Sequence, residues 1–255
     1  MEPTRVQLAY IKCLLAWTLF TSTLVLVLNW TQPIKHAGTA MGFGLVMLWI
    51  VVSGGLMVRY REVLLRAANR PLHGLPWQIR FVLFCTTLAL IEEAITTSMT
   101  NSAPLFGLKV GQAYITAGSN YFDVIAFHGV SLFVSFFVGW AVLLTRWRFS
   151  PTSVFLLFGI TGTFIEVVGF GVGHIMEYGM WSFVYGLMIW LPACAVPSDR
   201  PCSVPRWYHY PFAVFAPFAF MFLFPLLGVI SLFSPHHPHI HFAPKALEHV
   251  PPPYR

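Results

Sequence analysis

Residues 120–145 read NYFDVIAFHGVSLFVSFFVGWAVLLT, and the basic run Arg146-Trp147-Arg148 follows at once. The stretch is apolar along most of its length, and its acidic and histidine side chains, Asp123 and His128, lie near its beginning. A bilayer core of about 30 Å needs about 20 such residues in a helix. The stretch therefore predicts a membrane-spanning helix with polar groups toward one end and positive charge just beyond the other.

Six further stretches have the same apolar character. The whole set of seven is 9–29, 39–58, 79–98, 120–145, 152–172, 177–196 and 208–233. The composition agrees, because 57% of the residues are hydrophobic and 9% are charged, whereas soluble domains carry roughly 25% charged residues. We therefore predict an all-α, polytopic integral membrane helix bundle of about seven transmembrane helices. Residues 1–233 would form this single domain, and residues 234–255 a His/Pro-rich extracytoplasmic tail.

The positive charges divide unequally between the two sides that seven spans define. One side would hold Arg5, Lys12, Arg59, Arg61, Arg66, Arg70, Arg80, Arg146, Arg148, Arg200 and Arg206, and the other Lys35, Lys109, Lys245 and Arg255. Cytoplasmic loops carry the excess of lysine and arginine. We therefore predict a cytoplasmic N-terminus and an external C-terminus in a plasma or inner membrane. The expected partner of the positive charge is the lipid bilayer, with no nucleic acid.

Acidic and histidine side chains gather at the outer ends of the predicted spans. The set comprises Glu92, Glu93, Asp123, His128, Glu166, His174 and Glu177. Ionisable groups in a membrane are costly to bury, so they usually face a cavity, form pairs or carry a function. We therefore predict an acidic/histidine pocket in the outer leaflet half. Glu92 and Glu93 differ by about 100° around a helix axis, so we expect only one of them to point squarely into it.

The order of Glu92-Glu93, His128 and His174 resembles the order of motifs in the CAAX-processing and bacteriocin-processing membrane proteases. Those proteins carry a Glu-Glu pair followed by two separate histidine motifs on later helices. This chain departs from the pattern, since Thr97 stands where an arginine is expected and Tyr178 where an asparagine is expected. The resemblance implies an intramembrane hydrolase in which one carboxylate of the pair activates water and the histidines act as ligands or orienting groups.

A carboxylate and a histidine at one pocket can also hold a metal ion that activates water. The candidate ligands are Glu93, Asp123, His128, Glu166, His174 and Glu177. The ion would be a divalent transition metal such as Zn, Cu or Fe, which imidazole suits. The tail offers a second metal-binding candidate, a tract that contains His236, His237, His239 and His241.

Two other classes of protein remain open. Buried carboxylates and histidines are the usual proton or cation sites of transporters, although the inner halves of these spans offer no matching polar path. Alternatively, the acids form buried pairs in a non-catalytic structural or assembly subunit whose partners are other membrane subunits. Haem carriage would require an axial partner for His128 at the same depth.

Small residues in the spans predict close approach between helices. Ser131, Ser135 and Gly139 follow one another at four-residue spacing, and Gly159 and Gly162 share the fifth span. Such small-residue faces let helix backbones pack closely in a membrane.

Overall fold

The computed structural model describes residues 3–221 and residue 242, and this part of the chain is all-helical. Its α-helices are α1 (Arg5–Leu28), α2 (Pro33–Leu45), α3 (Gly54–Arg59), α4 (Arg61–Asn69), α5 (Trp77–Thr100), α6 (Tyr121–Val124), α7 (Val130–Arg146), α8 (Pro151–Phe170), α9 (Tyr178–Cys194) and α10 (His209–Met221). The π-helical segments are η1 (Val46–Ser53) and η3 (Ile125–Gly129), and the 3₁₀ turns are η2 (Ala103–Phe106) and η4 (Val172–Glu177). Within the described residues, β pairing is limited to two isolated bridges.

Each of the seven predicted stretches contains a helix or a continuous helical run. The first two runs begin earlier than predicted, because Thr4 and Gln7 form a capping box before α1 and Pro33 occupies the first turn of α2. Three runs, Arg5–Leu28, Pro33–Arg59 and Pro151–Gly169, are long and apolar enough to cross a membrane. The all-helical class is confirmed. The last part of the seventh stretch, 222–233, lies outside the described residues.

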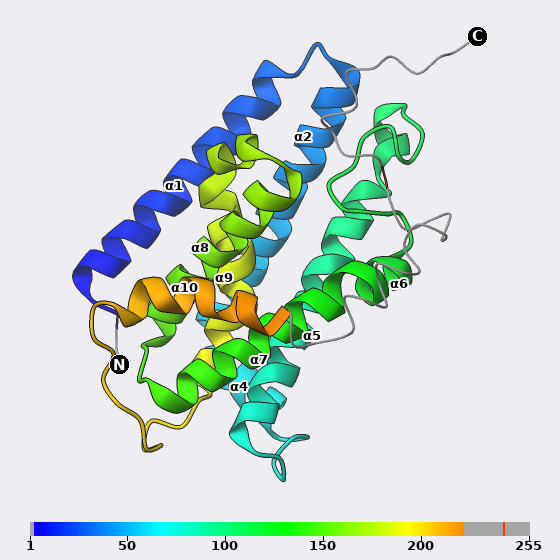
Figure 1. Cartoon of the computed structure of the whole chain (residues 1–255). Coiled ribbons are helices and arrows are strands. Elements are labelled where there is room, and N and C mark those ends of the chain that lie inside the picture. Colours follow the sequence, from blue (N-terminus) through cyan, green and yellow to red (C-terminus); the bar gives the residue numbers. More distant parts are fainter. Residues whose placement is uncertain (1–2, 222–241, 243–255) are drawn as a thin grey trace.

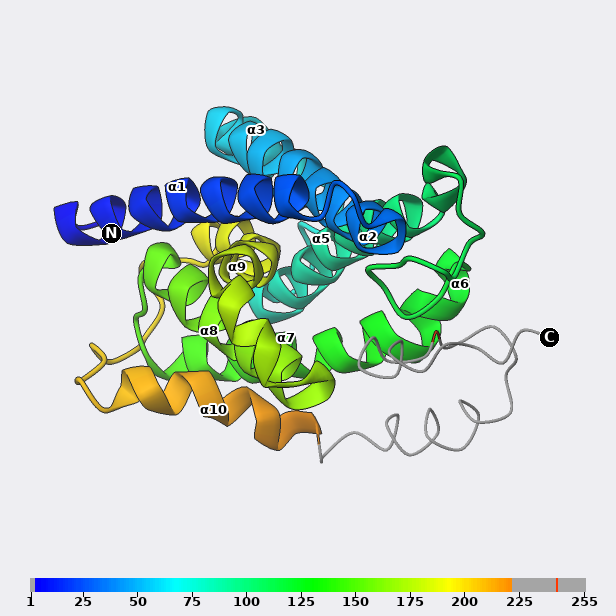
Figure 2. The same cartoon turned by 90° about the horizontal axis from the view of Figure 1, so that it is seen from above.

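Helices α8 and α9 form an antiparallel pair in the middle of the bundle. Figure 2 shows α1 and α10 on opposite sides of this pair. Helix α7 packs against α10, and α5 packs against both α7 and α9 (Figure 1). The C-terminal parts of α5 and α8 and the N-terminal part of α9 are therefore brought close together, and these are the segments that carry the predicted acids.

Glycines set the closest helix contacts. A Cβ atom at Gly159 would lie 2.6 Å from the Ser182 carbonyl oxygen of α9, and one at Gly162 would overlap the Tyr185 ring. A Cβ atom at Gly139 would lie 3.1 Å from the Cα atom of Pro217 in α10. The predicted close approach is thus confirmed at three glycines, and it presses α8 directly onto α9.

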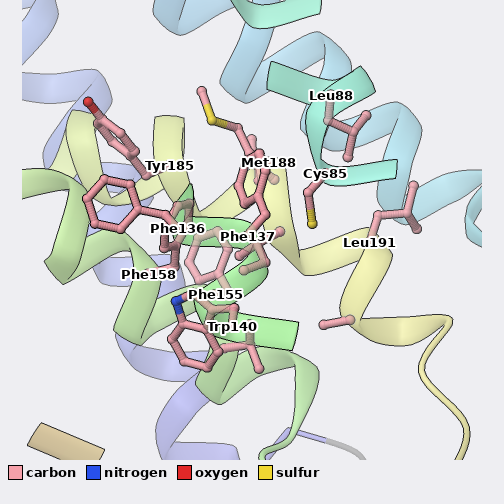
Figure 3. Packing of buried hydrophobic residues seen from close by; sticks show 14 of the residues in the cluster. Cys85, Leu88, Phe136, Phe137, Trp140, Phe155, Phe158, Tyr185, Met188 and Leu191 are labelled. Carbon is pink, nitrogen blue, oxygen red and sulfur yellow. The ribbon is translucent and has the colours of Figure 1, made fainter. Parts of the chain in front are cut away.

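Aromatic side chains fill the space between α7, α8 and α9. Phe136, Phe137, Trp140 and Phe158 are completely buried there. In Figure 3, Tyr185 lies at the edge of this cluster, and its hydroxyl points away from the other rings. Lipid tails are as apolar as these rings, so close packing rather than exclusion of water has to hold such helices together in a membrane.

The loop 101–120 connects α5 to α6 and packs onto α2. Its Ala103 and Ala113 are buried against Ala37 and Met41. Two hydrogen bonds fix the loop to the end of α5, one from the Ile115 amide to the Thr100 hydroxyl at 3.1 Å and one from the Asn101 side chain to the Ser119 carbonyl at 2.8 Å. The loop is therefore an ordered layer over one end of the bundle.

Phe242 lies on this loop. Its amide donates to the Ala117 carbonyl at 2.7 Å, and its ring centroid is 4.8 Å from that of Tyr114. Phe242 thus contacts the end of the bundle at which α5 ends.

Candidate functional site

Helix α5 carries two adjacent glutamates into the bundle. Glu92 is only 4% exposed, and Glu93 is half-buried. Each lies close enough to Glu166 of α8 for their charges to interact, and Glu92 also interacts with Glu93. Both members of the pair therefore take part in one cluster, although their directions on the helix differ.

Glu166 is held by a tyrosine that the sequence analysis did not single out. The Tyr185 hydroxyl of α9 donates a hydrogen bond to Glu166 Oε1 at 2.5 Å, and both residues are buried. Tyr185 also interacts electrostatically with Glu92 and Glu93. We call these four residues, Glu92, Glu93, Glu166 and Tyr185, the acid centre.

Local packing explains how Tyr185 reaches Glu166. Gly162 lies one helical turn before Glu166, and its missing side chain leaves room for the Tyr185 ring. The ring then rests between Phe133 and Phe158, with centroid distances of 5.8 Å and 6.1 Å. Because glycine is needed at this crossing, the sequence of α8 sets both the helix contact and the hydrogen bond.

Glu93 contacts the π-helical segment that carries His128. A Cβ atom at Gly129 would lie 3.1 Å from Glu93 Oε1, and Gly129 directly follows His128 in η3. The Thr96 hydroxyl lies 3.4 Å from Glu93 Oε2. π-helical turns occur frequently at functional sites. The structure thus brings the backbone at His128 to the acid centre, although the His128 side chain lies outside the described residues.

The two glutamates of α5 lack basic partners within the described part of the chain. Within the described part of the chain, neither Glu92 nor Glu93 forms an ion pair with a lysine or arginine. Two buried hydroxyls nearby, Thr97 one turn after Glu93 and Ser182 one turn before Tyr185, have no hydrogen-bond partner there. Buried polar groups are nearly always hydrogen-bonded, so these two hydroxyls are exceptions within the described bundle.

His174 and Glu177 form a separate unit on the turn η4. His174 Nδ1 and Glu177 Oε2 are 2.9 Å apart, and the Trp181 indole donates to the same oxygen at 3.0 Å. The Glu177 side chain is 49% exposed, unlike the buried carboxyls. Asp123 is half-buried in the first turn of α6. The predicted tail ligands His236, His237, His239 and His241 lie outside the described residues.

No metal-binding group emerges from the side chains that the structure describes. Among them, no set of three or more His, Cys, Asp or Glu residues could hold a metal ion. A metal ion at the acid centre would therefore need a ligand beyond this set, and His128 is the nearest candidate along the chain.

An apolar groove of about 420 Å³ lies along a different face of α5. Its lining comprises Leu48, Thr87, Leu90, Ile91, Ala94, Ile95, Ser98 and Tyr121. The Tyr121 hydroxyl donates to the Leu90 carbonyl at 3.0 Å, and Tyr121 also interacts electrostatically with Glu93. The carboxyl groups of the acid centre do not line this groove, so the predicted open pocket is not formed by it.

Comparisons with protein-family models, with curated proteins and with solved structures find no match to this chain. The geometry of the acid centre is therefore the basis for the function proposed below. Tyr185 is the one member of the acid centre that sequence reasoning missed. A signal was present, because a tyrosine within an apolar span needs a partner for its hydroxyl.

Proposed function

We propose that this chain is a seven-span membrane protein with its N-terminus in the cytoplasm and its C-terminus outside. A helical run at each predicted stretch supports this topology, as does the unequal division of the basic residues. A further support is the C-terminal region. The His209 ring at the start of α10 lies 4.5 Å from the ring of Trp147, which directly follows α7 and its last residue Arg146. Phe242, in contrast, contacts the loop that follows the C-terminal end of α5.

Cysteine labelling tests this topology. In a variant without the native cysteines, Lys109→Cys on the loop 101–120 should react with a membrane-impermeant maleimide in intact cells. His73→Cys, between α4 and α5, should react only after permeabilisation. Labelling of both positions from the same side would contradict the proposed topology.

We propose that the acid centre, together with His128, holds a divalent transition metal ion and activates water for a hydrolytic reaction. The contact between Glu93 and Gly129 carries this proposal, because it joins the carboxyl cluster to the segment of the predicted histidine. A cation would also balance the charges of Glu92 and Glu93, for which the described residues supply no lysine or arginine.

In this proposal each residue has a distinct task. Glu93 is half-buried and weakly held, so it is the candidate base that accepts a proton from the attacking water. Glu92 and Glu166 are more deeply buried and would hold the cation. The bound ion would supply Lewis-acid polarisation of the water.

A structural subunit is the second candidate. The observation that favours it is the internal hydrogen bond between Tyr185 and Glu166, which satisfies one buried carboxyl without any ligand. In this case the acid centre would fix α8 against α9 and would not take part in a reaction.

Metal content separates the two candidates. We would replace the four tail histidines by alanine in the full chain, which retains Phe242, and measure metal by elemental analysis after purification. The metal proposal predicts about one ion per chain, lost in Glu93→Gln and in His128→Ala but retained in the control Glu62→Gln, whose carboxylate pairs with Arg61 far from the centre. Absence of metal from the parent protein would contradict the metal proposal.

A further inference from the structure

Glu166 and Glu93 of the acid centre differ in the hydrogen bonds that their carboxyl groups accept. Glu166 accepts a 2.5 Å hydrogen bond from a buried phenol. Among the described residues, Glu93 has the Thr96 hydroxyl as a polar partner at 3.4 Å, and that hydroxyl also lies 3.2 Å and 3.1 Å from the backbone carbonyls of Glu92 and Glu93. One carboxyl therefore has a fixed donor, and the other has a shared and distant one.

The donor to Glu166 is itself fixed by packing. Tyr185 is 4% exposed, and its ring lies across Gly162 in the closest part of the contact between α8 and α9. Phe133 and Phe158 flank the ring on other sides. Side chains enclosed in this way sit in one rotamer, so the hydroxyl cannot follow a carboxyl that turns away.

We propose that Tyr185 is the positioning residue of the acid centre, which sets the orientation of Glu166 toward Glu92 and Glu93 through the hydrogen bond to Oε1. This assignment rests on the proposed function where it concerns cation binding. Groups that hydrogen-bond to a metal ligand orient it, and their loss typically costs about 10–100-fold in metal affinity. The ionisable groups of the described residues that face Tyr185 are Glu166, Glu92 and Glu93, from α8 and α5.

Infrared spectroscopy tests the positioning role without any metal. Glu166→Gln identifies the carboxyl band of Glu166, and Tyr185→Phe should shift that band because the short hydrogen bond is lost. Tyr10→Phe is the matched control, since it also removes one tyrosine hydroxyl from a hydrogen bond, the 2.8 Å contact between Tyr10 and Tyr178. An unchanged band in Tyr185→Phe would overturn the proposal.

A second form of the experiment avoids any change in packing. Incorporation of 3-fluorotyrosine at position 185 retains the ring and the hydroxyl but makes the hydroxyl a stronger donor. The Glu166 band should then move in the direction opposite to that in Tyr185→Phe. If Tyr185→Phe does not fold, a fluorotyrosine protein with an unshifted band would still overturn the assignment.

Zinc titration of the metal-free full chain, with the tail histidines replaced, tests the link to cation binding. Tyr185→Phe should weaken Zn²⁺ binding about 10–100-fold, and Tyr10→Phe should leave it unchanged. Equal affinity in Tyr185→Phe and the parent would overturn the role of Tyr185 in cation binding. If the parent binds no Zn²⁺, the proposed function fails, and the infrared result alone decides whether Tyr185 positions Glu166.

Discussion

Two regions along α5 differ in the partners of their charged or acidic side chains. At the beginning of α5, the Arg200 guanidinium lies 5.7 Å from the Trp77 ring centroid and donates to backbone carbonyls, to Leu144 at 2.8 Å, Pro197 at 2.7 Å and Trp147 at 3.4 Å. Burial lowers the pKa of Arg200 from its ordinary value, but an arginine stays protonated at neutral pH. This charge satisfies carbonyls at the end of α7 that have no partner within the helix.

About two turns before the end of α5, by contrast, acidic side chains lie near one another. Glu92 and Glu93 face Glu166, and neither pairs with a basic residue of the described chain. A cation placed on helix carbonyls strengthens the fold, whereas grouped acids without a cation are costly to keep. The basic end therefore acts as a structural cap, and the contrast is the reason why we propose a function for the acid centre.

The scaffold beneath the acid centre should be the most sensitive part of the molecule. Gly159→Ala would place a Cβ atom 2.6 Å from the backbone of Ser182, so the two helices must separate. We expect a loss of about 2–3 kcal/mol in the free energy of unfolding, the cost of overpacking. Gly169→Ala, on the same helix but with nothing within 4 Å, should instead gain up to about 1 kcal/mol. Denaturant titration in detergent measures both, and equal effects would contradict the described contact.

The basic end should respond in stability alone. Arg200→Ala removes charge-assisted hydrogen bonds to carbonyls and should lower the free energy of unfolding by about 2 kcal/mol, with metal content unchanged. Arg200→Lys keeps the charge but lacks the planar guanidinium group. The free energy of unfolding of this variant should therefore lie between those of the parent and Arg200→Ala. A change of metal content in Arg200→Ala would show that Arg200 affects the acid centre, and would contradict a purely structural role for this arginine.

The turn η4 should show the smallest effect. Glu177→Gln weakens a half-exposed pair with His174, and such pairs contribute about 0–1 kcal/mol. We expect both the free energy of unfolding and the metal content to stay close to those of the parent. Loss of metal in this variant would instead support the sequence-based prediction that Glu177 is a metal ligand.

The all-helical class could be predicted from the sequence, because it requires only that apolar stretches are long enough to form helices. The sequence also led to the prediction that Glu92, Glu93 and Glu166 lie at similar depths, because depth follows from the direction proposed for each span. Rotation about the helix axes could not be predicted, because these spans are apolar on nearly every side. That only one of Glu92 and Glu93 points squarely into a pocket therefore stays a prediction, and both residues interact electrostatically with Glu166.

Other features depend on local backbone detail. The π-helical turn η3 changes which residues of the 120–145 stretch face α5, and nothing in its composition indicates it. The position of His174 and Glu177 follows from η4, where the chain leaves α8 at Gly171 with a positive φ of 112°. The partner of Tyr185 became evident only from the crossing at Gly162.

The most direct test of the central claim is the free energy of unfolding of Glu93→Gln, measured in metal-free protein beside the parent. Because Glu93 has one distant hydroxyl partner and no basic partner in the described chain, the account predicts that removing its charge leaves stability unchanged or raises it. A loss of about 3 kcal/mol or more, the cost of breaking a buried pair, would contradict the account and make the acid centre a structural element of the bundle.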